Sequence, residues 1–157
     1  MRLWLLVQSA VAALPFVGTA VAKPEKIRGV RDPIYHLYLQ AHPRNASQVV
    51  LGPEATAGQF DIAGTIRSAT TARYLNIGTD STSYKTLTFD NSSRTDAWGL
   101  EGDTIITRQG SSLGRNLNFV VCRLEGSYWQ IWLQTGSAMP SGSSCSNYQT
   151  IHLPCLC

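Results

Sequence analysis

The strongest strand signal in the chain is Tyr128-Trp-Gln-Ile-Trp-Leu-Gln134, an alternating run rich in aromatic side chains. Successive side chains of a β-strand point to opposite faces of the sheet. Trp129, Ile131 and Leu133 therefore share one face, which we expect to enter a hydrophobic core. The opposite face carries Tyr128, Gln130, Trp132 and Gln134.

Short apolar or alternating runs separated by turn residues continue this pattern along the chain. An apolar run at residues 117–122, followed by a turn at residues 124–127, predicts a hairpin with the strand above. Further strands are expected at residues 34–39, 49–51, 60–66, 74–77, 86–89, 98–100 and 104–107. About nine closely spaced strands predict one all-β domain, which is a small antiparallel barrel, a sandwich or a β-trefoil-like fold.

Composition narrows the class of protein. The 157 residues fit one domain with its own core. Charged residues make up 15% of the chain, against about 25% in typical soluble domains. The net charge of +3 is too small and dispersed for an electrostatic nucleic-acid binder. A chain of this size and composition excludes multi-domain enzymes and membrane transporters, and it favours an extracellular all-β domain.

The N-terminus has the pattern of a secretory signal peptide. Arg2 supplies a positive charge, residues 3–17 are almost wholly apolar, and Ala20-Val-Ala22 provides a small-x-small cleavage site. We therefore expect residues 1–22 to be a signal peptide. No later segment has the roughly 18 apolar residues of a membrane span, and the C-terminus lacks the hydrophobic tail of a GPI signal. The prediction is a secreted protein without a membrane span or lipid anchor.

The segment after the signal peptide is short and mixed in charge. We interpret residues 23–33 as a flexible basic arm and residues 34–157 as the all-β domain. Two N-glycosylation sequons lie in polar stretches of that domain, at Asn45 and Asn91.

All four cysteines lie near the C-terminus, at Cys122, Cys145, Cys155 and Cys157. In an oxidising compartment they predict disulfides, with three possible connectivities. We favour Cys122 with Cys145, because a bridge would fix the Gly/Ser/Pro-rich loop that holds Cys145. Cys155 and Cys157 are too close in sequence for an unstrained bridge, so crossed pairing or a link to another molecule stays open. Residues 152–157 read H-x-x-C-x-C, but disulfides in an exported protein are the better interpretation, so no metal site is expected.

No constellation in the sequence meets the requirements of a catalytic site. Gly110-Ser-Ser-Leu-Gly114 matches the G-x-S-x-G nucleophile motif, but a polar loop leads from it into a strand, where the motif needs a strand-to-helix turn. Acid–base candidates are spread along the chain without a distinctive spacing: His36, His42, Asp90, Asp96, Glu101, Asp103 and His152. The prediction is no enzyme, no catalytic residue and no cofactor.

The polar face of the 128–134 strand is the best candidate for ligand binding. Tyr128 and Trp132 alternate there with Gln130 and Gln134. Aromatic rings stack on apolar faces of sugars, and amides donate and accept hydrogen bonds. The competing interpretation is that these side chains only cover the sheet.

The C-terminal third resembles a family of secreted fungal proteins. The residues that carry the likeness are Asn118-Phe-Val-Val-Cys122, Gly126-Ser-Tyr-Trp-Gln-Ile-Trp-Leu133, Thr135-Gly-Ser-Ala-Met-Pro-Ser-Gly142 and Cys145. The family comprises cell-wall proteins similar to the phialide- and conidium-associated wall protein of filamentous ascomycetes. Trp98 resembles the Trp that precedes this block in the family. The resemblance implies a wall-associated, non-enzymatic protein and a Cys122–Cys145 bridge, and it supplies no catalytic residue.

These observations lead to one main functional hypothesis. We expect a secreted fungal cell-wall or surface protein with a structural or developmental role, with wall polysaccharide or another wall protein as its partner. The alternatives are a secreted effector or toxin that acts on another organism, and a small secreted hydrolase or ribonuclease.

Overall fold

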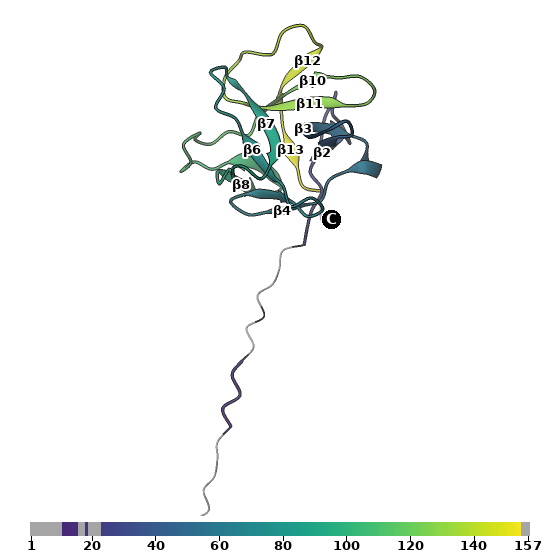
Figure 1. Ribbon diagram of the computed structural model, residues 1–157. Coiled ribbons are helices and arrows are strands. Elements are labelled where there is room, and N and C mark those ends of the chain that lie inside the picture. Colours follow the sequence, from purple (N-terminus) through teal and green to yellow (C-terminus); the bar gives the residue numbers. More distant parts are fainter. Residues whose placement is uncertain (1–10, 16–17, 19–22, 155–157) are drawn as a thin grey trace, which may run out of the picture.

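The structure is a computed structural model that describes residues 11–15, 18 and 23–154. Most of the expected signal peptide, as well as Cys155 and Cys157, lies outside the described residues. Residues 11–15 and 18 are exposed and have no regular secondary structure (Figure 1). Within the described chain, no helix combines the length and the apolar character that a membrane crossing requires.

The domain is built almost wholly from short strands. In chain order they are β1 (Arg28–Gly29), β2 (Tyr38–His42), β3 (Asn45–Gly52), β4 (Phe60–Ile62), β5 (Ile66–Ser68), β6 (Tyr74–Ile77), β7 (Tyr84–Asp90), β8 (Trp98–Glu101), β9 (Thr104–Thr107), β10 (Phe119–Arg123), β11 (Trp129–Gln134), β12 (Cys145–Gln149) and β13 (Ile151–His152). One turn of 3₁₀ helix, η1 (Glu54–Thr56), follows β3. The prediction of an all-β domain is confirmed.

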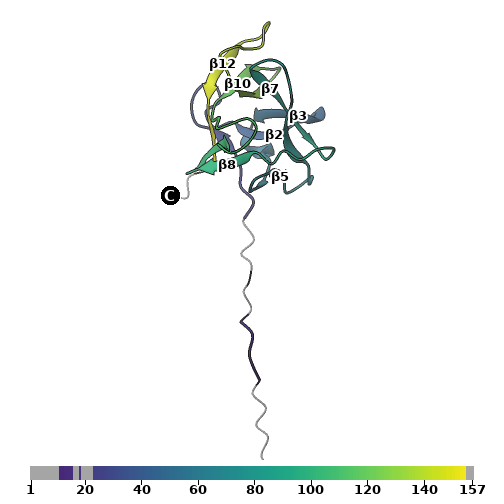
Figure 2. The ribbon, with the colours of Figure 1, turned by 90° about the vertical axis from the view of Figure 1, so that its left-hand side faces the viewer.

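The strands form one antiparallel, nearly closed, barrel-like sheet, so the barrel is the correct choice among the three expected architectures. The strand order is β4-β5-β6-β7-β11-β3-β2-β1-β13-β9-β8. β10 pairs with β11 and β12 outside this path. Figures 1 and 2 show the sheet curling round on itself. Closure is helped by Glu25 and Phe60, which exchange two backbone hydrogen bonds of 2.9 and 2.8 Å.

The core contains the inward-facing residues of the curled sheet. Ile131 and Leu133 of β11 are buried as the alternation predicts, and Trp129 packs against the core while partly exposed. Trp98 is fully buried, and its Nε1 donates to the Leu75 carbonyl at 2.9 Å. The inner and outer faces of β11 are therefore assigned correctly by periodicity at these positions.

The expectation of a flexible arm at residues 23–33 is wrong. Ile27 is fully buried in the core, and β1 pairs with both β2 and β13. Ile27 lies between two basic residues, Lys26 and Arg28, and the alternation of the strand places the apolar side chain inside and a basic one on either side. The all-β domain thus begins before residue 34.

Two segments expected to be single strands, residues 34–39 and 60–66, are not single strands in the structure. Residues 34–39 do not form one alternating strand, because the backbone turns at His36 (φ 56°) and brings both Ile34 and Leu39 into the core. Residues 60–66 form a hairpin, β4–β5, whose turn is closed by the hydrogen bond from Ala63 N–H to the Thr65 carbonyl at 2.9 Å.

The Cys122–Cys145 disulfide is present. The two residues are direct partners in the β10–β12 ladder, with their Cα atoms 4.1 Å apart. The bridge therefore fastens β12, which follows the Gly/Ser-rich loop, to the hairpin of β10 and β11.

Candidate functional site

Strand β11 lies in the middle of the sheet and carries the residues expected to contact a ligand. On one side it pairs with β10, and on the other side it pairs first with β3 and then with β7. Tyr128, just before the strand, and Gln130 and Trp132 within it are all partly exposed. The structure therefore brings these three side chains together on the outer face.

Trp132 has an aromatic neighbour on the adjacent strand. Its direct ladder partners are Val120 on β10 and Thr86 on β7. The Tyr84 ring meets the indole edge to face, with centroids 6.4 Å apart and planes at 86°. Such a contact holds both rings in place, so Trp132 presents a fixed surface.

Gln130 and Tyr128 are also held by neighbours. Gln48 Nε2 donates to Gln130 Oε1 at 3.2 Å across the β3–β11 pair. The Tyr128 ring covers Gly52: a Cβ on that glycine would come within 2.6 Å of Tyr128 Cε1. The ring of His42 lies 5.3 Å from that of Tyr128.

Gln134 does not have the expected solvent-facing role. Its side chain is only 3% exposed. Its Nε2 donates to the Gly136 carbonyl at 2.8 Å, and its Oε1 accepts from the Tyr148 N–H at 2.7 Å. Both ends of the amide are therefore used inside the protein, and Gln134 positions the chain around it rather than meeting a ligand.

Tyr148, whose backbone N–H donates to Gln134, is a residue that the sequence reasoning missed. The β10–β12 register shifts between Phe119 and Val121, so that β12 has a bulge at this point. Tyr148 adopts φ 53°, a left-handed conformation that is strained for a bulky residue. Its side chain remains 50% exposed. Bulges of this kind re-aim a side chain, and here the side chain is an aromatic ring directed outward.

Hydrogen bonds hold the backbone of Tyr148 at both its N–H and its carbonyl. Its N–H is taken by Gln134 Oε1, and its carbonyl accepts from the guanidinium of Arg31. The next residue, Gln149, is buried, and its Nε2 donates to the Asp32 carbonyl at 3.1 Å and to Ser146 Oγ at 2.9 Å. Strained conformations persist where the surroundings over-determine them, typically at functional sites.

A polar hollow of about 290 Å³ lies beside Tyr148. Amide and hydroxyl side chains of Asn118, Thr135 and Ser137 line it together with the tyrosine ring.

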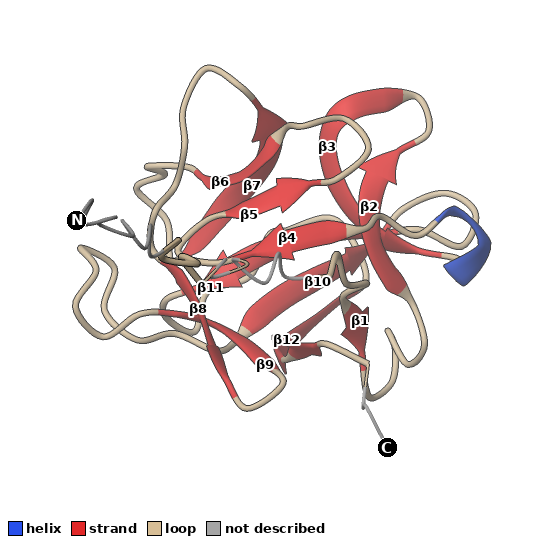
Figure 3. Ribbon diagram, turned by 90° about the horizontal axis from the view of Figure 1, so that it is seen from below, coloured by secondary structure: helices blue, strands red, loops and turns tan. Residues whose placement is uncertain are grey.

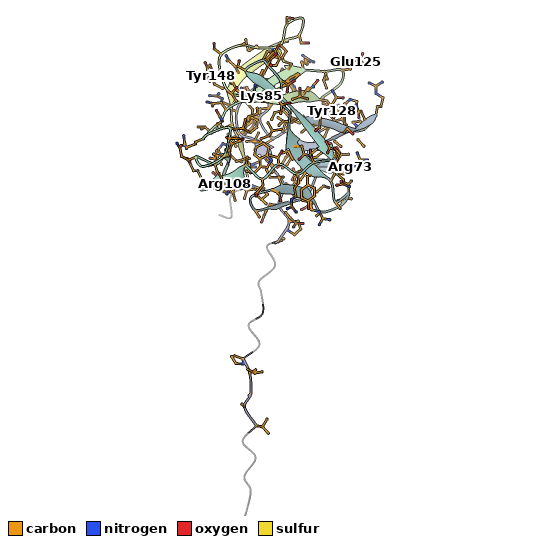
Figure 4. The ribbon with its side chains drawn as sticks, turned by 60° about the vertical axis from the view of Figure 1, so that its left-hand side comes forward. Arg73, Lys85, Arg108, Glu125, Tyr128 and Tyr148 are labelled. Atoms are coloured by element: carbon orange, nitrogen blue, oxygen red, sulfur yellow. A yellow bond between two sulfur atoms is a disulfide. The ribbon has the colours of Figure 1, made fainter. Side chains whose placement is uncertain are left out.

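From Tyr128 to Gln134 the strand advances about 20 Å at 3.3 Å per residue. In Figure 4, Tyr128 and Tyr148 lie on opposite sides of the upper part of the molecule, with Lys85 between them. We call the set Tyr128, Gln130, Trp132 and Tyr148 the β11 face.

Two carboxylates support strand β7 at the edge of this face. Thr86 donates to Asp80 through its backbone N–H at 2.8 Å and its hydroxyl at 2.9 Å. These hydrogen bonds, the backbone one first, hold the pKa of Asp80 below its ordinary value. At Asp90, burial raises the pKa, but hydrogen bonds from Ser92, Thr88 and Ser93 outweigh it and the pKa is lowered. Both groups are ionised at neutral pH and serve the local structure.

Three of the candidate carboxylates each contact a different basic side chain, and one of these contacts joins two acid–base candidates, Asp103 and His152. Asp96 pairs with Arg108, Glu101 pairs with Arg115, and Asp103 pairs with His152. The hydrogen bond from Arg115 lowers the pKa of Glu101 and, in the same way, His152 lowers that of Asp103. Among the described residues, no three His, Cys, Asp or Glu side chains gather as metal ligands would.

The remaining marked residues lie in loops or at strand ends. Residues 110–114 belong to the connection between β9 and β10, where the Thr107 hydroxyl donates to the Gly114 carbonyl at 2.7 Å, and no helix follows. His36 stacks on Tyr35, with ring centroids 3.9 Å apart. The sequon residues Asn45 and Asn91 are both exposed, which glycosylation requires.

No family model matches this chain, and no curated protein or solved structure matches it either.

Proposed function

We propose that this protein is a secreted, non-enzymatic fungal cell-wall or surface protein that binds neutral wall polysaccharide on its β11 face. The observation that carries the proposal is the arrangement of Tyr128, Gln130 and Trp132 along β11, together with Tyr148 on β12, each held by a named neighbour. The family resemblance supplies the fungal wall as the setting.

The chemistry of the face suits an uncharged sugar chain. Tyr and Trp rings offer apolar surfaces with a polar edge, and the amides of Gln48, Gln130 and Asn118 offer donors and acceptors for hydroxyl groups. A rigid aromatic platform also binds with little loss of side-chain freedom. The stretch from Tyr128 to Trp132 is about 13 Å long at 3.3 Å per residue, which suits more than one unit of a sugar chain.

The absence of catalytic activity in this proposal is supported by the placement of the carboxylates. Hydrolysis of a glycosidic bond by two carboxyl groups requires them to flank one bond about 5–9 Å apart. Asp96, Glu101 and Asp103 are each engaged with a different basic partner. None of these three carboxylates belongs to the β11 face.

The proposal is tested by co-sedimentation of the secreted protein with isolated fungal cell walls, insoluble β-glucan and chitin. Tyr148→Ala and Trp132→Ala are each expected to weaken retention, because loss of a stacking aromatic costs about 1 kcal/mol and lowers affinity roughly fivefold. Tyr35→Ala is the matched control, since Tyr35 is a similarly exposed tyrosine (56%) outside this face. Equal retention of all three variants and the unaltered protein contradicts binding at the β11 face.

Fractionation of the producing fungus tests the setting. We expect most of the protein in the wall fraction, and a part that needs reductant for its release would indicate a disulfide tether through Cys155 or Cys157. Recovery of nearly all the protein from the culture medium would overturn the wall assignment and favour the effector alternative.

A further inference from the structure

A second hollow, of about 270 Å³, opens at one end of the barrel and has no lining residue in common with the β11 face. We call it the barrel mouth. Its walls come from the β2–β3 hairpin, from the chain after η1, from β4 and β7, and from the β5–β6 connection. Figure 3 shows the arrangement of these elements, with η1 in blue beside β2 and β3 and the β4–β5 pair next to them. Mouths of β-barrels are recurrent sites for small ligands.

The barrel mouth exists because small residues face two large rings. Phe60 and Phe89 form its inner end, with their rings stacked at 5.8 Å between centroids and 11° between planes. Ala41, Ala46 and Ala57 line the walls and leave the space open. Residue 58 must also be small, because a Cβ on Gly58 would come within 2.5 Å of Phe60 Cζ.

The amide at the barrel mouth is fully used by the protein. Gln40 Nε2 donates to the carbonyls of Tyr38 and Pro53, both at 3.0 Å, and its Oε1 accepts from the Thr56 hydroxyl at 2.6 Å. Gln40 therefore fixes the chain around η1 and offers little to a ligand. The side chain instead keeps the wall of the hollow in place.

The hydroxyl groups of Ser68, at the end of β5, and of Thr71, on the β5–β6 connection, accept hydrogen bonds from the backbone, so their protons are available for donation to a ligand. Ser68 Oγ accepts from the Thr71 N–H at 3.1 Å, and Thr71 Oγ1 accepts from the Arg73 N–H at 3.4 Å. Thr70 makes no hydrogen bond with its side chain to any described residue of the protein. No acidic or basic side chain lines the barrel mouth within the described part of the chain.

We infer that the barrel mouth binds a small, uncharged, mainly apolar molecule that carries an oxygen acceptor, such as an aromatic or terpenoid ketone. The apolar part would lie against Phe60 and Phe89, and the oxygen would accept a hydrogen bond from the Thr70 hydroxyl. A carboxylate or phosphate is disfavoured, because entering the hollow strips its water and no cation replaces it. This inference is independent of polysaccharide binding.

The test uses the purified full chain and the fluorescent ketone 6-propionyl-2-(dimethylamino)naphthalene, which is uncharged. We expect saturable binding with a blue shift in emission. 8-Anilinonaphthalene-1-sulfonate, an anionic naphthalene of similar size, is expected to bind at least tenfold more weakly. Equal or tighter binding of the anion would overturn the assignment of an uncharged ligand, and lack of saturable binding by the ketone would overturn the site.

Substitutions at neighbouring alanines locate the binding. Ala57→Leu fills the barrel mouth and is expected to reduce ketone affinity at least tenfold. Ala55→Leu is the matched control, because Ala55 lies two residues away on η1, is exposed and does not line the hollow. Ala46→Leu provides a second filling variant from a different wall, should Ala57→Leu fail to fold. Equal affinities for the filled and control variants contradict the inference.

Removal of one hydroxyl tests the polar contact. Thr70→Val keeps the shape of the side chain and removes its donor, and it is expected to weaken ketone binding roughly 2- to 12-fold, the range for one neutral hydrogen bond. Polysaccharide retention of these variants should be unchanged, so failure of the barrel-mouth site is distinguishable from failure of the β11 face. A Thr70→Val variant that binds the ketone as the unaltered protein does would remove Thr70 from the proposal.

Discussion

The strained backbone of Tyr148 can be separated from the contribution of its ring by comparing two substitutions. Tyr148→Ala and Tyr148→Gly both remove the ring, and they differ in how well the new residue accepts φ 53°. A left-handed conformation costs an L-residue about 1–2 kcal/mol and costs glycine almost nothing. Glycine loses more conformational freedom on folding, by about 0.5–1 kcal/mol. Tyr148→Gly should therefore be more stable than Tyr148→Ala by about 0.5–1 kcal/mol.

The measurement is the free energy of unfolding in urea for both variants, with thermal unfolding as a second readout. A domain of this size is expected to show a difference in Tm of about 2–5 °C. Retention on cell walls should fall equally in the two variants, because both lack the ring. A Tyr148→Ala variant as stable as Tyr148→Gly would refute the reasoning, since it would show that residue 148 is not confined to the left-handed region.

Three further predictions concern the disulfide, the acid response and the sequons. Replacing Cys122 and Cys145 together by Ser should lower the free energy of unfolding by about 3.4 kcal/mol, the chain-entropy value for a loop of this length. Urea unfolding measures this loss, and a smaller loss would show that the unfolded chain without the bridge retains structure in the loop between the two residues. Asp80 has a lowered pKa in the folded state, so its stabilising effect is present above its unfolded pKa of about 3.9 and is lost as the pH falls through the folded value. The free energy of unfolding of Asp80→Asn should therefore decline less between pH 5 and pH 2 than that of the unaltered protein. Parallel declines in the two proteins would contradict this. Secreted protein should lose mass on enzymatic removal of N-glycans, and the loss should shrink in Asn45→Gln and in Asn91→Gln; no change in mass for either variant would exclude glycosylation at that site.

Local sequence pattern predicted the elements that carry their own signal. The alternation in β11 identified its inner residues Ile131 and Leu133, and the apolar runs of β6 and β9 identified both strands with their observed bounds. The Cys122–Cys145 bridge was predictable from the loop that it closes. Each of these features depends on residues that are close in sequence.

The features that were missed depend on partners far away in the chain. β1 has two residues and exists because it pairs with β2 and β13, so a local reading of its charges shows only an arm. β12 and β13 follow a Gly/Ser-rich loop, and Tyr148 owes its exposure to a bulge opposite β10. No property of the residues around Tyr148 encodes that register, because a bulge is set by the pairing of two strands.

Buried glutamines connect the fold to both candidate sites. An apolar residue at position 40, 134 or 149 would add to the core, yet each position carries an amide that is at most 3% exposed. Gln40 fixes the wall of the barrel mouth, and Gln134 and Gln149 fix the backbone around Tyr148. A buried amide is stabilising only when its partners are met, and here the partners include backbone carbonyls of connecting segments, at Asp32, Pro53 and Gly136. The barrel thus uses interior polar groups to hold irregular segments rigid at the places where a ligand would meet them. The aromatic residues of the β11 face also serve the fold, because Tyr128 covers Gly52 and Trp132 packs against Tyr84. A glutamine in a strand, with its neighbours in the core, is the more informative signal for where loops are positioned.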